Sequence, residues 1–180
     1  MLGIIRRTNP DRTVVVAALT TEAPLAERLP RLPEADRNLI LTVHYYQPMA
    51  FTHQGAAWAP EFRSDKPVDW GSPDDRARMT RDFEAVAAWA AEARRPVYLG
   101  EFGVYDAAPA AARARWLGHA AATARRLGWP FAVWQFDHDF ALYDTDRERW
   151  NAPVLRALMP DAPPGADRPG PPPARRYNPR

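Results

Sequence analysis

Side chains that could do chemistry end three short apolar runs of this sequence. His44 and Tyr46 end one run, Glu101 follows a second, and Trp134 lies near the end of a third. Glycines lie immediately before Glu101 and two residues after it, and glycine lets the backbone come close to a ligand. In parallel α/β folds, working residues lie at the carboxyl ends of strands. The pattern therefore indicates a ligand site at the ends of neighbouring strands, with a carboxylate in it.

Strand-like and helix-like segments alternate along the chain. Apolar runs predict strands at 13–18, 39–46, 96–102 and 131–136. Helices are predicted at 23–29, 73–94, 109–127 and 152–159, with the end of another at 4–8. Such alternation is typical of parallel βαβ units, which form either half of an eight-unit barrel or an open, doubly wound sheet. No glycine-rich phosphate loop follows any strand, so the nucleotide-binding form of the open sheet is unsupported.

Composition excludes several classes of function. The 180 residues carry a formal net charge of +2, and the tail 161–180 accounts for all of it, so a nucleic-acid partner is not expected. The absence of cysteine excludes disulfides, thiolate metal sites and a cysteine nucleophile. No stretch approaches the roughly 20 apolar residues that span a membrane, and the start lacks the features of a signal peptide.

The tail 161–180 is rich in proline and arginine, and we expect it to be disordered.

The strand-end residues and three longer segments, 8–16, 44–58 and 140–151, together resemble the C-terminal half of the catalytic barrel of glycoside hydrolase family 5, the cellulase family. The resemblance covers about residues 6–160. It implies an α/β fold of the (β/α)8 TIM-barrel type, of which this chain holds the last four β/α units in a domain of residues 1–160. The tail 161–180 would follow that domain.

The resemblance also implies roles for single residues. Glu101 matches the family's nucleophile, Tyr46 the tyrosine that donates to that carboxylate and keeps it ionised, and His44 the histidine beside it. Trp134 matches the tryptophan platform under the sugar. Further substrate contacts are expected from Trp58, Gln135 and His53, and Trp70 and His138 lie in loops on the same expected face. No cofactor is implied, and no group of residues has the spacing of metal ligands.

Two positions depart from the family pattern. Gln135 stands where many relatives carry glutamate, and Leu19–Thr20–Thr21 stands where relatives often place an aromatic residue. The first difference affects a polar contact, and the second removes one expected contact with the substrate.

The implied activity is endoglucanase-like: retaining hydrolysis of a β-1,4-glucan, a related polysaccharide or an oligosaccharide. Retaining enzymes use two carboxyl groups about 5 to 5.5 Å apart. The family's acid/base glutamate lies in an Asn-Glu-Pro motif, and this chain contains no such motif. The chain alone is therefore expected to be inactive, with the missing N-terminal half of the barrel as its partner. Because the family's enzymes are usually secreted, the resemblance implies an extracellular location.

Other interpretations stay open. The half-barrel could be a non-catalytic module that binds glycans or assembles with a second copy, or the product of a truncated gene. An unrelated α/β protein would show the same alternation of strands and helices. Taken singly, Glu101 fits a solvated loop glutamate, His44 a hydrogen-bonded core histidine, and Trp134 a core residue.

Overall fold

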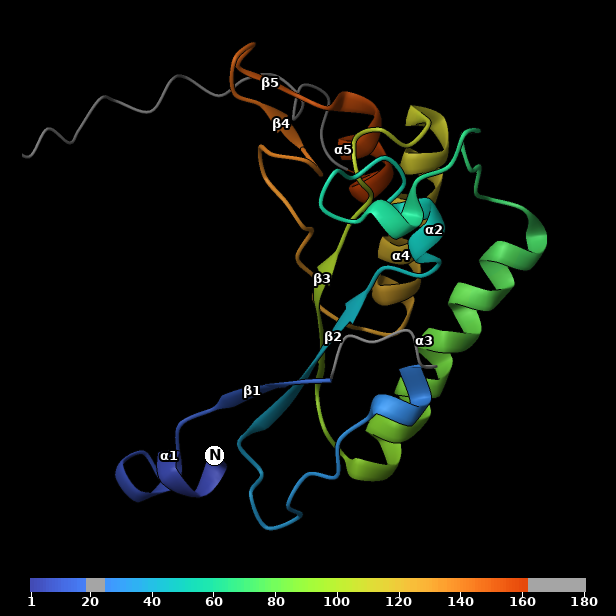
Figure 1. Cartoon of the computed structure of the whole chain (residues 1–180). Coiled ribbons are helices and arrows are strands. Elements are labelled where there is room, and N and C mark those ends of the chain that lie inside the picture. The colour runs from blue at the N-terminus through green and yellow to red at the C-terminus, as the bar shows by residue number, and fades with distance from the viewer. Residues whose placement is uncertain (19–24, 162–180) are drawn as a thin grey trace, which may run out of the picture.

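The centre of the fold is a parallel sheet of three strands. The structure is a computed structural model that describes residues 1–18 and 25–161. Strands β1 (Val14–Ala17), β2 (Leu39–Tyr45) and β3 (Val97–Phe102) lie in the order β1-β2-β3 (Figure 1). Both pairings are parallel. The first three predicted strands and their parallel arrangement are therefore confirmed.

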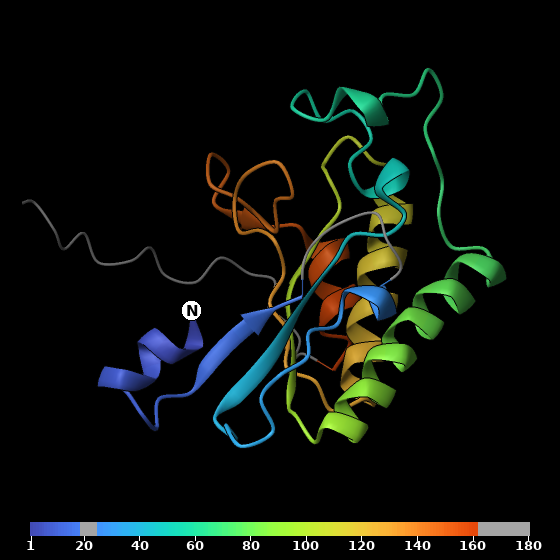
Figure 2. The ribbon, with the colours of Figure 1, turned by 60° about the horizontal axis from the view of Figure 1, so that its bottom comes forward.

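Helices cover one face of this sheet. The helices and 3-10 turns are α1 (Leu2–Thr8), η1 (Leu25–Arg28), α2 (Met49–Thr52), η2 (Pro60–Phe62), α3 (Pro73–Ala93), α4 (Ala110–Arg126) and α5 (Ala152–Leu158). The long helices α3 and α4 lie on the same side of the sheet (Figure 2), and α5 packs against α4. This is the arrangement of consecutive βα units that wind in one direction.

The core lies between the sheet and the long helices. Alternate residues of β2 and β3 point toward α3 and α4, and Leu41, Val43 and Leu99 are fully buried there. The opposite face of the sheet is open. Val15 is 52% exposed, and Ile40 and Tyr98 are half-buried. An apolar sheet face left partly in water is typical of a surface that packs against another element.

Helix α3 begins with a capping box. Ser72 Oγ accepts a hydrogen bond from Asp75 N at 3.1 Å, and Ser72 N donates to Asp75 Oδ2 at 3.0 Å. Pro73 occupies the first helical position, where no backbone donor is needed. The helix ends at Arg94 with φ of 50°, and its buried side carries Met79, Phe83 and Val86. The predicted helix 73–94 is confirmed to within a residue.

Replacing Ser72 with alanine is expected to destabilise the chain by about 1 kcal/mol, because the backbone N–H of Asp75 loses its acceptor and the Asp75 carboxylate loses the bond from the Ser72 hydroxyl. The melting temperature should fall by about 2–4 °C. Urea denaturation followed by circular dichroism measures the change. Ser64→Ala is the matched control because Ser64 lies in an exposed turn, and a loss of equal size there would contradict the capping explanation.

The prediction of a fourth regular strand at 131–136 is wrong. The segment runs beside β3 with a single parallel bridge, between Leu99 and Phe131. Its other bonds to β3 are spaced apart, with Ala132 N donating to Leu99 O and Trp134 N to Phe102 O, both at 2.9 Å. Because β3 carries a bulge between these two points, consecutive pairs do not form. The segment is extended, but it is not a continuous strand.

Three other regions differ from the prediction. Residues 140–151 contain a short antiparallel hairpin of β4 (Tyr143–Asp144) and β5 (Arg149–Trp150). The loop 47–72 contains α2 and η2. The predicted helix 23–29 is the 3-10 turn η1 where it is described. Leu19–Thr20–Thr21 and the tail from 162 onward lie outside the described residues. Within the described ranges, no helix is both long and apolar enough to cross a membrane.

Candidate active site

The carboxylate of Glu101 lies against two side chains from the neighbouring strand end. Tyr46 Oη donates a hydrogen bond to Glu101 Oε2 at 3.1 Å, and His44 Nδ1 lies 3.4 Å from the same oxygen. In the β2–β3 register, His44 is the partner of Glu101. Within the described chain, the second oxygen, Oε1, has no hydrogen-bond partner. One oxygen is held and the other is free, which leaves the carboxylate oriented and available to a ligand.

A bulge in β3 sets the position of Glu101. Val43 pairs with Leu99 and His44 pairs with Glu101, so Gly100 is the extra residue of β3. A Cβ atom at Gly100 would clash with Thr42 Oγ1 and would also lie 3.3 Å from the Tyr98 ring. Only glycine fits there, because Thr42 and Tyr98, on the sheet face away from α3 and α4, already fill the space.

Tyr46 is a permanent hydrogen-bond donor. Burial, and then the negative charge and hydrogen bonding of Glu101, raise the pKa of the Tyr46 phenol well above its usual value of 10.0. Loss of its proton would put a second negative charge beside the carboxylate in a partly buried place. The hydroxyl therefore stays protonated and keeps donating to Glu101.

An aromatic wall surrounds Tyr46. Its ring contacts His53 edge-on, with centroids 5.3 Å apart, and Phe140 at 6.1 Å. Trp58 contacts His53 at 5.2 Å and stacks on Phe140 at 6.5 Å. His53 is buried, while Trp58 is 57% exposed. The wall therefore has a packed base and a tryptophan whose face is open to solvent, which suits contact with an apolar ligand face.

Glu101 and this wall enclose a pocket of about 370 Å³. Its lining residues are Tyr46, His53, Trp58, Glu101, Trp134, Gln135, Asp139 and Phe140. Trp134 is 43% exposed. A volume of a few hundred Å³ with aromatic walls and few polar groups is typical of small-molecule sites.

Most of the predicted site residues meet in one place. Glu101, Tyr46 and the four predicted substrate-binding residues all line the pocket, whereas His44 contacts Glu101 without lining it. Trp70 is buried in the core against Phe51, and the exposed His138 does not line the pocket.

Sequence reasoning missed Phe140 and Asp139 as pocket residues. The sequence gives Phe140 only as part of the segment 140–151 that carries the family resemblance, and it predicts no role for Asp139. Their only signal was their closeness in sequence to Trp134. A lone aromatic or acidic residue in a loop has no pattern that predicts what it contacts.

Acidification is expected to lower the free energy of unfolding as the pH falls below about 6.5. Burial lowers the folded-state pKa of His53, and also of His119, below the usual 6.5. In this window the unfolded chain binds more protons than the folded chain, so stability is lost on the acid side and regained above it. Urea midpoints measured between pH 5 and 8 test this. His53→Gln should flatten the profile, and an unchanged slope in that variant would remove His53 from the explanation.

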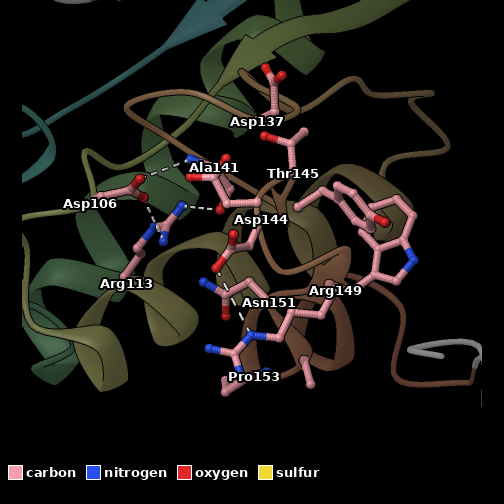
Figure 3. A pocket seen from close by; sticks show the side chains of 13 residues that line it. Asp106, Arg113, Asp137, Ala141, Asp144, Thr145, Arg149, Asn151 and Pro153 are labelled. Atoms are coloured by element: carbon pink, nitrogen blue, oxygen red, sulfur yellow. Dashed lines mark hydrogen bonds and ion pairs between the residues drawn. The ribbon is translucent and has the colours of Figure 1, made fainter. Parts of the chain in front are cut away.

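A second, larger pocket of about 730 Å³ lies beside the hairpin β4–β5 (Figure 3). It includes Asp106 and Arg113 from the β3–α4 region, and Asp137 and Ala141 from the segment that follows Trp134. The segment 135–141 therefore contributes residues to both pockets. Among residues 1–18 and 25–161, no three histidine or acidic side chains are grouped so that they could hold a metal ion.

A carboxylate oriented at the carboxyl ends of parallel strands, beside aromatic rings, is typical of the ligand sites of parallel α/β enzymes. The match to known proteins is more specific. Residues 1–139 match the cellulase family, glycosyl hydrolase family 5. The chain belongs to this family of glycosidases.

Relatives agree in fold and sequence. Endoglucanase H of Acetivibrio thermocellus is 31% identical over 165 residues, which is 88% of this chain and 17% of that protein. Subunit Z of the cellulose synthase of Clostridioides difficile has a TM-score of 0.80 at 28% identity, over 88% of this chain and 52% of that one. Thermotoga maritima Cel5A bound to cellobiose has a TM-score of 0.77 at 34% identity, over 87% of this chain and 51% of that one. The same enzyme is also known with mannotriose.

The chain thus spans about half the length of these solved relatives and a smaller part of the endoglucanase. The likeness to barrel enzymes over about half of their chains agrees with a partial barrel built from helices and parallel strands.

Proposed function

We propose that this chain carries the nucleophile half of a retaining β-glycosidase, with Glu101 as the nucleophile. One observation carries the proposal: Glu101 lies at the floor of an aromatic pocket, with Oε2 held by Tyr46 at 3.1 Å and Oε1 free of partners within the described residues. A nucleophile must be ionised and aimed. The Tyr46 hydroxyl, which donates to Oε2, and the His44 ring 3.4 Å from the same oxygen fix the orientation of the carboxylate.

Catalysis in this proposal begins when Glu101 attacks the anomeric carbon. A bond forms between its oxygen and that carbon, the glycosidic carbon–oxygen bond breaks, and the leaving oxygen takes a proton from an acid. Water then cleaves the ester to Glu101 with retention of configuration. Trp134 offers its exposed face to the sugar, Gln135 supplies an amide to a hydroxyl group, and His53 and Trp58 form the wall.

The acid/base carboxyl would come from a further segment that completes the barrel. The chain holds no Asn-Glu-Pro motif, and the solved relatives that it matches are about twice as long as the matched part. The open sheet face supports the same view, because Val15 is exposed and the outer edge of β1 has no partner strand among residues 1–18 and 25–161. Residues 1–160 would form the C-terminal half of the catalytic domain.

The proposed substrate is a β-1,4-glucan or a related β-linked polysaccharide. Cellobiose and mannotriose are bound by a relative at 33–34% identity. The proposed polysaccharide substrates are too large to enter a cell, so we propose that the protein acts outside the cell.

An activated glycoside tests the nucleophile without the missing acid. In 2,4-dinitrophenyl β-cellobioside the leaving phenolate needs no proton, so attack by Glu101 proceeds without an acid catalyst. The chain alone should release dinitrophenolate and accumulate a cellobiosyl ester, seen as a mass increase on the peptide containing Glu101. Azide, which needs no base to attack, should release β-cellobiosyl azide. Unmodified cellulose should not be cleaved. If no dinitrophenolate is released and no peptide is labelled, the catalytic proposal fails.

The alternative function is a non-catalytic glycan-binding half-barrel. The absence of the acid/base motif favours it, because binding needs only the aromatic wall and the platform. Isothermal titration with cellotriose separates the two. Cellotriose binding without any labelling of Glu101 by the activated glycoside would support the alternative. In that case the affinity for cellotriose would be unchanged in Glu101→Gln.

A further inference from the structure

Arg113 is a buried arginine that serves no role in the function proposed above. It lies on α4, and its side chain is 6% exposed. Its guanidinium reaches three partners: Nε donates to Val104 O at 3.0 Å, Nη2 to Ala141 O at 2.7 Å, and Nη1 pairs with Asp106 Oδ1 at 2.8 Å. Figure 3 shows the fork of Arg113 between Asp106 and Ala141. One side chain thus joins a long helix to two separate loops.

Asp106 adds a second connection between the same loops. Its Oδ2 accepts a hydrogen bond from Ala141 N at 3.3 Å, and its own backbone N–H donates to Asp139 O at 2.7 Å. Residues 139–141 are therefore tied on both sides of Phe140, by Asp106 at Asp139 and by Asp106 and Arg113 at Ala141. A loop held at both flanks of one residue has little freedom to move that residue.

Phe140 is the residue that these bonds hold in place. Its ring is 4% exposed and contacts Tyr46, His53, Trp58 and Tyr105, with centroid distances of 6.1, 5.8, 6.5 and 5.8 Å. Phe140 and the adjacent Asp139 line the pocket that contains Glu101. A shift of residues 139–141 would open the aromatic wall beside Glu101.

The choice of arginine is physically informative. Burying a guanidinium is costly, and burial lowers the pKa of Arg113 while the charge of Asp106 opposes that change. An apolar residue would fill the same space at less cost, but it could not bond two carbonyl groups and a carboxylate in one plane. The cost is offset by a fixed loop geometry, which is what a binding pocket requires.

We infer that Arg113, together with Asp106, is a positioning residue for the glycan pocket, and that it acts through residues 139–141 on the wall formed by Phe140. This inference rests on the proposed function, because it takes a glycan as the ligand of that pocket.

The test compares Arg113→Lys with Arg126→Lys in the full chain. Lysine keeps the positive charge beside Asp106, but it lacks the planar fork of arginine and the separate Nε donor that bonds Val104 O. Arg126 lies on the same helix, where it makes an exposed pair with Glu84 at 3.4 Å. Arg113→Lys should weaken cellotriose binding about tenfold or more, the size of one lost buried hydrogen bond to a charged group. Arg126→Lys should bind like the original chain.

Amide hydrogen exchange distinguishes a local change in residues 139–143 from a general loss of stability. In Arg113→Lys, protection should fall in residues 139–143, while the amides of β2 and of helix α3 keep theirs. Asp106→Asn, which is less buried, is the second variant should the lysine variant fail to fold. It should show the same local loss and a smaller loss of affinity.

The outcomes separate the two proposals. If the original chain does not bind cellotriose, the proposed function fails and the positioning role falls with it. If the original chain binds cellotriose and both Arg113→Lys and Asp106→Asn bind equally well, the positioning role is overturned and the proposed function stands. Uniformly reduced protection without a change in affinity would also overturn it, because that marks a purely structural residue.

Discussion

Replacing Glu101 with glutamine is expected to abolish the release of dinitrophenolate from 2,4-dinitrophenyl β-cellobioside. The amide has the shape of the carboxylate and can still accept the Tyr46 hydrogen bond, but it cannot act as the nucleophile. Loss of a nucleophile typically costs about 10⁴-fold or more in rate. The release rate should therefore fall to that of the uncatalysed reaction, and the mass increase on the Glu101 peptide should disappear.

The matched control for this variant is Glu61→Gln. Glu61 lies in η2 near the same pocket and acts electrostatically on His53, but it is exposed and does not line the pocket. Its loss should leave dinitrophenolate release within about threefold, a change typical of a solvated charge. Circular dichroism and the urea midpoint verify that both variants fold. If Glu101→Gln keeps the rate of the original chain, another group performs the attack.

Replacing Trp116 with alanine is expected to be the most destabilising single change in the chain. Trp116 is fully buried on α4. Its ring lies 6.0 Å from Tyr45 and 6.2 Å from Phe102, and its Nε1 donates to Gln47 O at 3.0 Å. Removing a buried tryptophan costs about 3–5 kcal/mol, since contacts are lost and a cavity remains. Urea denaturation measures this loss directly.

Trp58→Ala is the control for the packing explanation. Trp58 is 57% exposed, so its removal should cost less than about 1 kcal/mol. A similar loss of stability for both tryptophans would show that burial is not the cause. Cellotriose binding should show the opposite order. Trp58→Ala should weaken it more than Trp116→Ala does, because Trp58 lines the pocket and Trp116 does not.

The core and the site are connected through neighbouring residues of the same strand ends. Tyr45 and Phe102 point into the core against Trp116, while Tyr46 and Glu101, one residue away from each, meet at the pocket. Successive residues of an extended chain point to opposite sides. The packing of Trp116 therefore supports the backbone that carries the proposed nucleophile.

Local patterns in the sequence were enough to predict much of this protein. The apolar runs predicted three of the strands, and the predicted helix 73–94 matches α3. The meeting of Tyr46 with Glu101 was also predictable. In parallel units, each strand ends at the same edge of the sheet, so short patterns far apart in sequence give neighbours in space.

Other features depend on contacts that no local pattern encodes. Trp70, which the sequence placed in a loop on the face of the site, lies in the core, whereas Phe140 had no predicted role and forms part of the wall. The segment 131–136 has the composition of a strand, but the bulge at Gly100 interrupts its ladder with β3.

The loops show the same division between local and tertiary information. Arg113 sits within a helical run of alanines and arginines, and nothing in that run indicates that its guanidinium ties two loops together. Periodicity and capping act between residues close in sequence. The amino-acid sequence by itself therefore determined most helices and strands and the edge of the sheet where the site lies. The course of each loop is decided by long-range packing and by the need to pair buried polar groups, so only the tertiary structure decided which side chains complete the pocket.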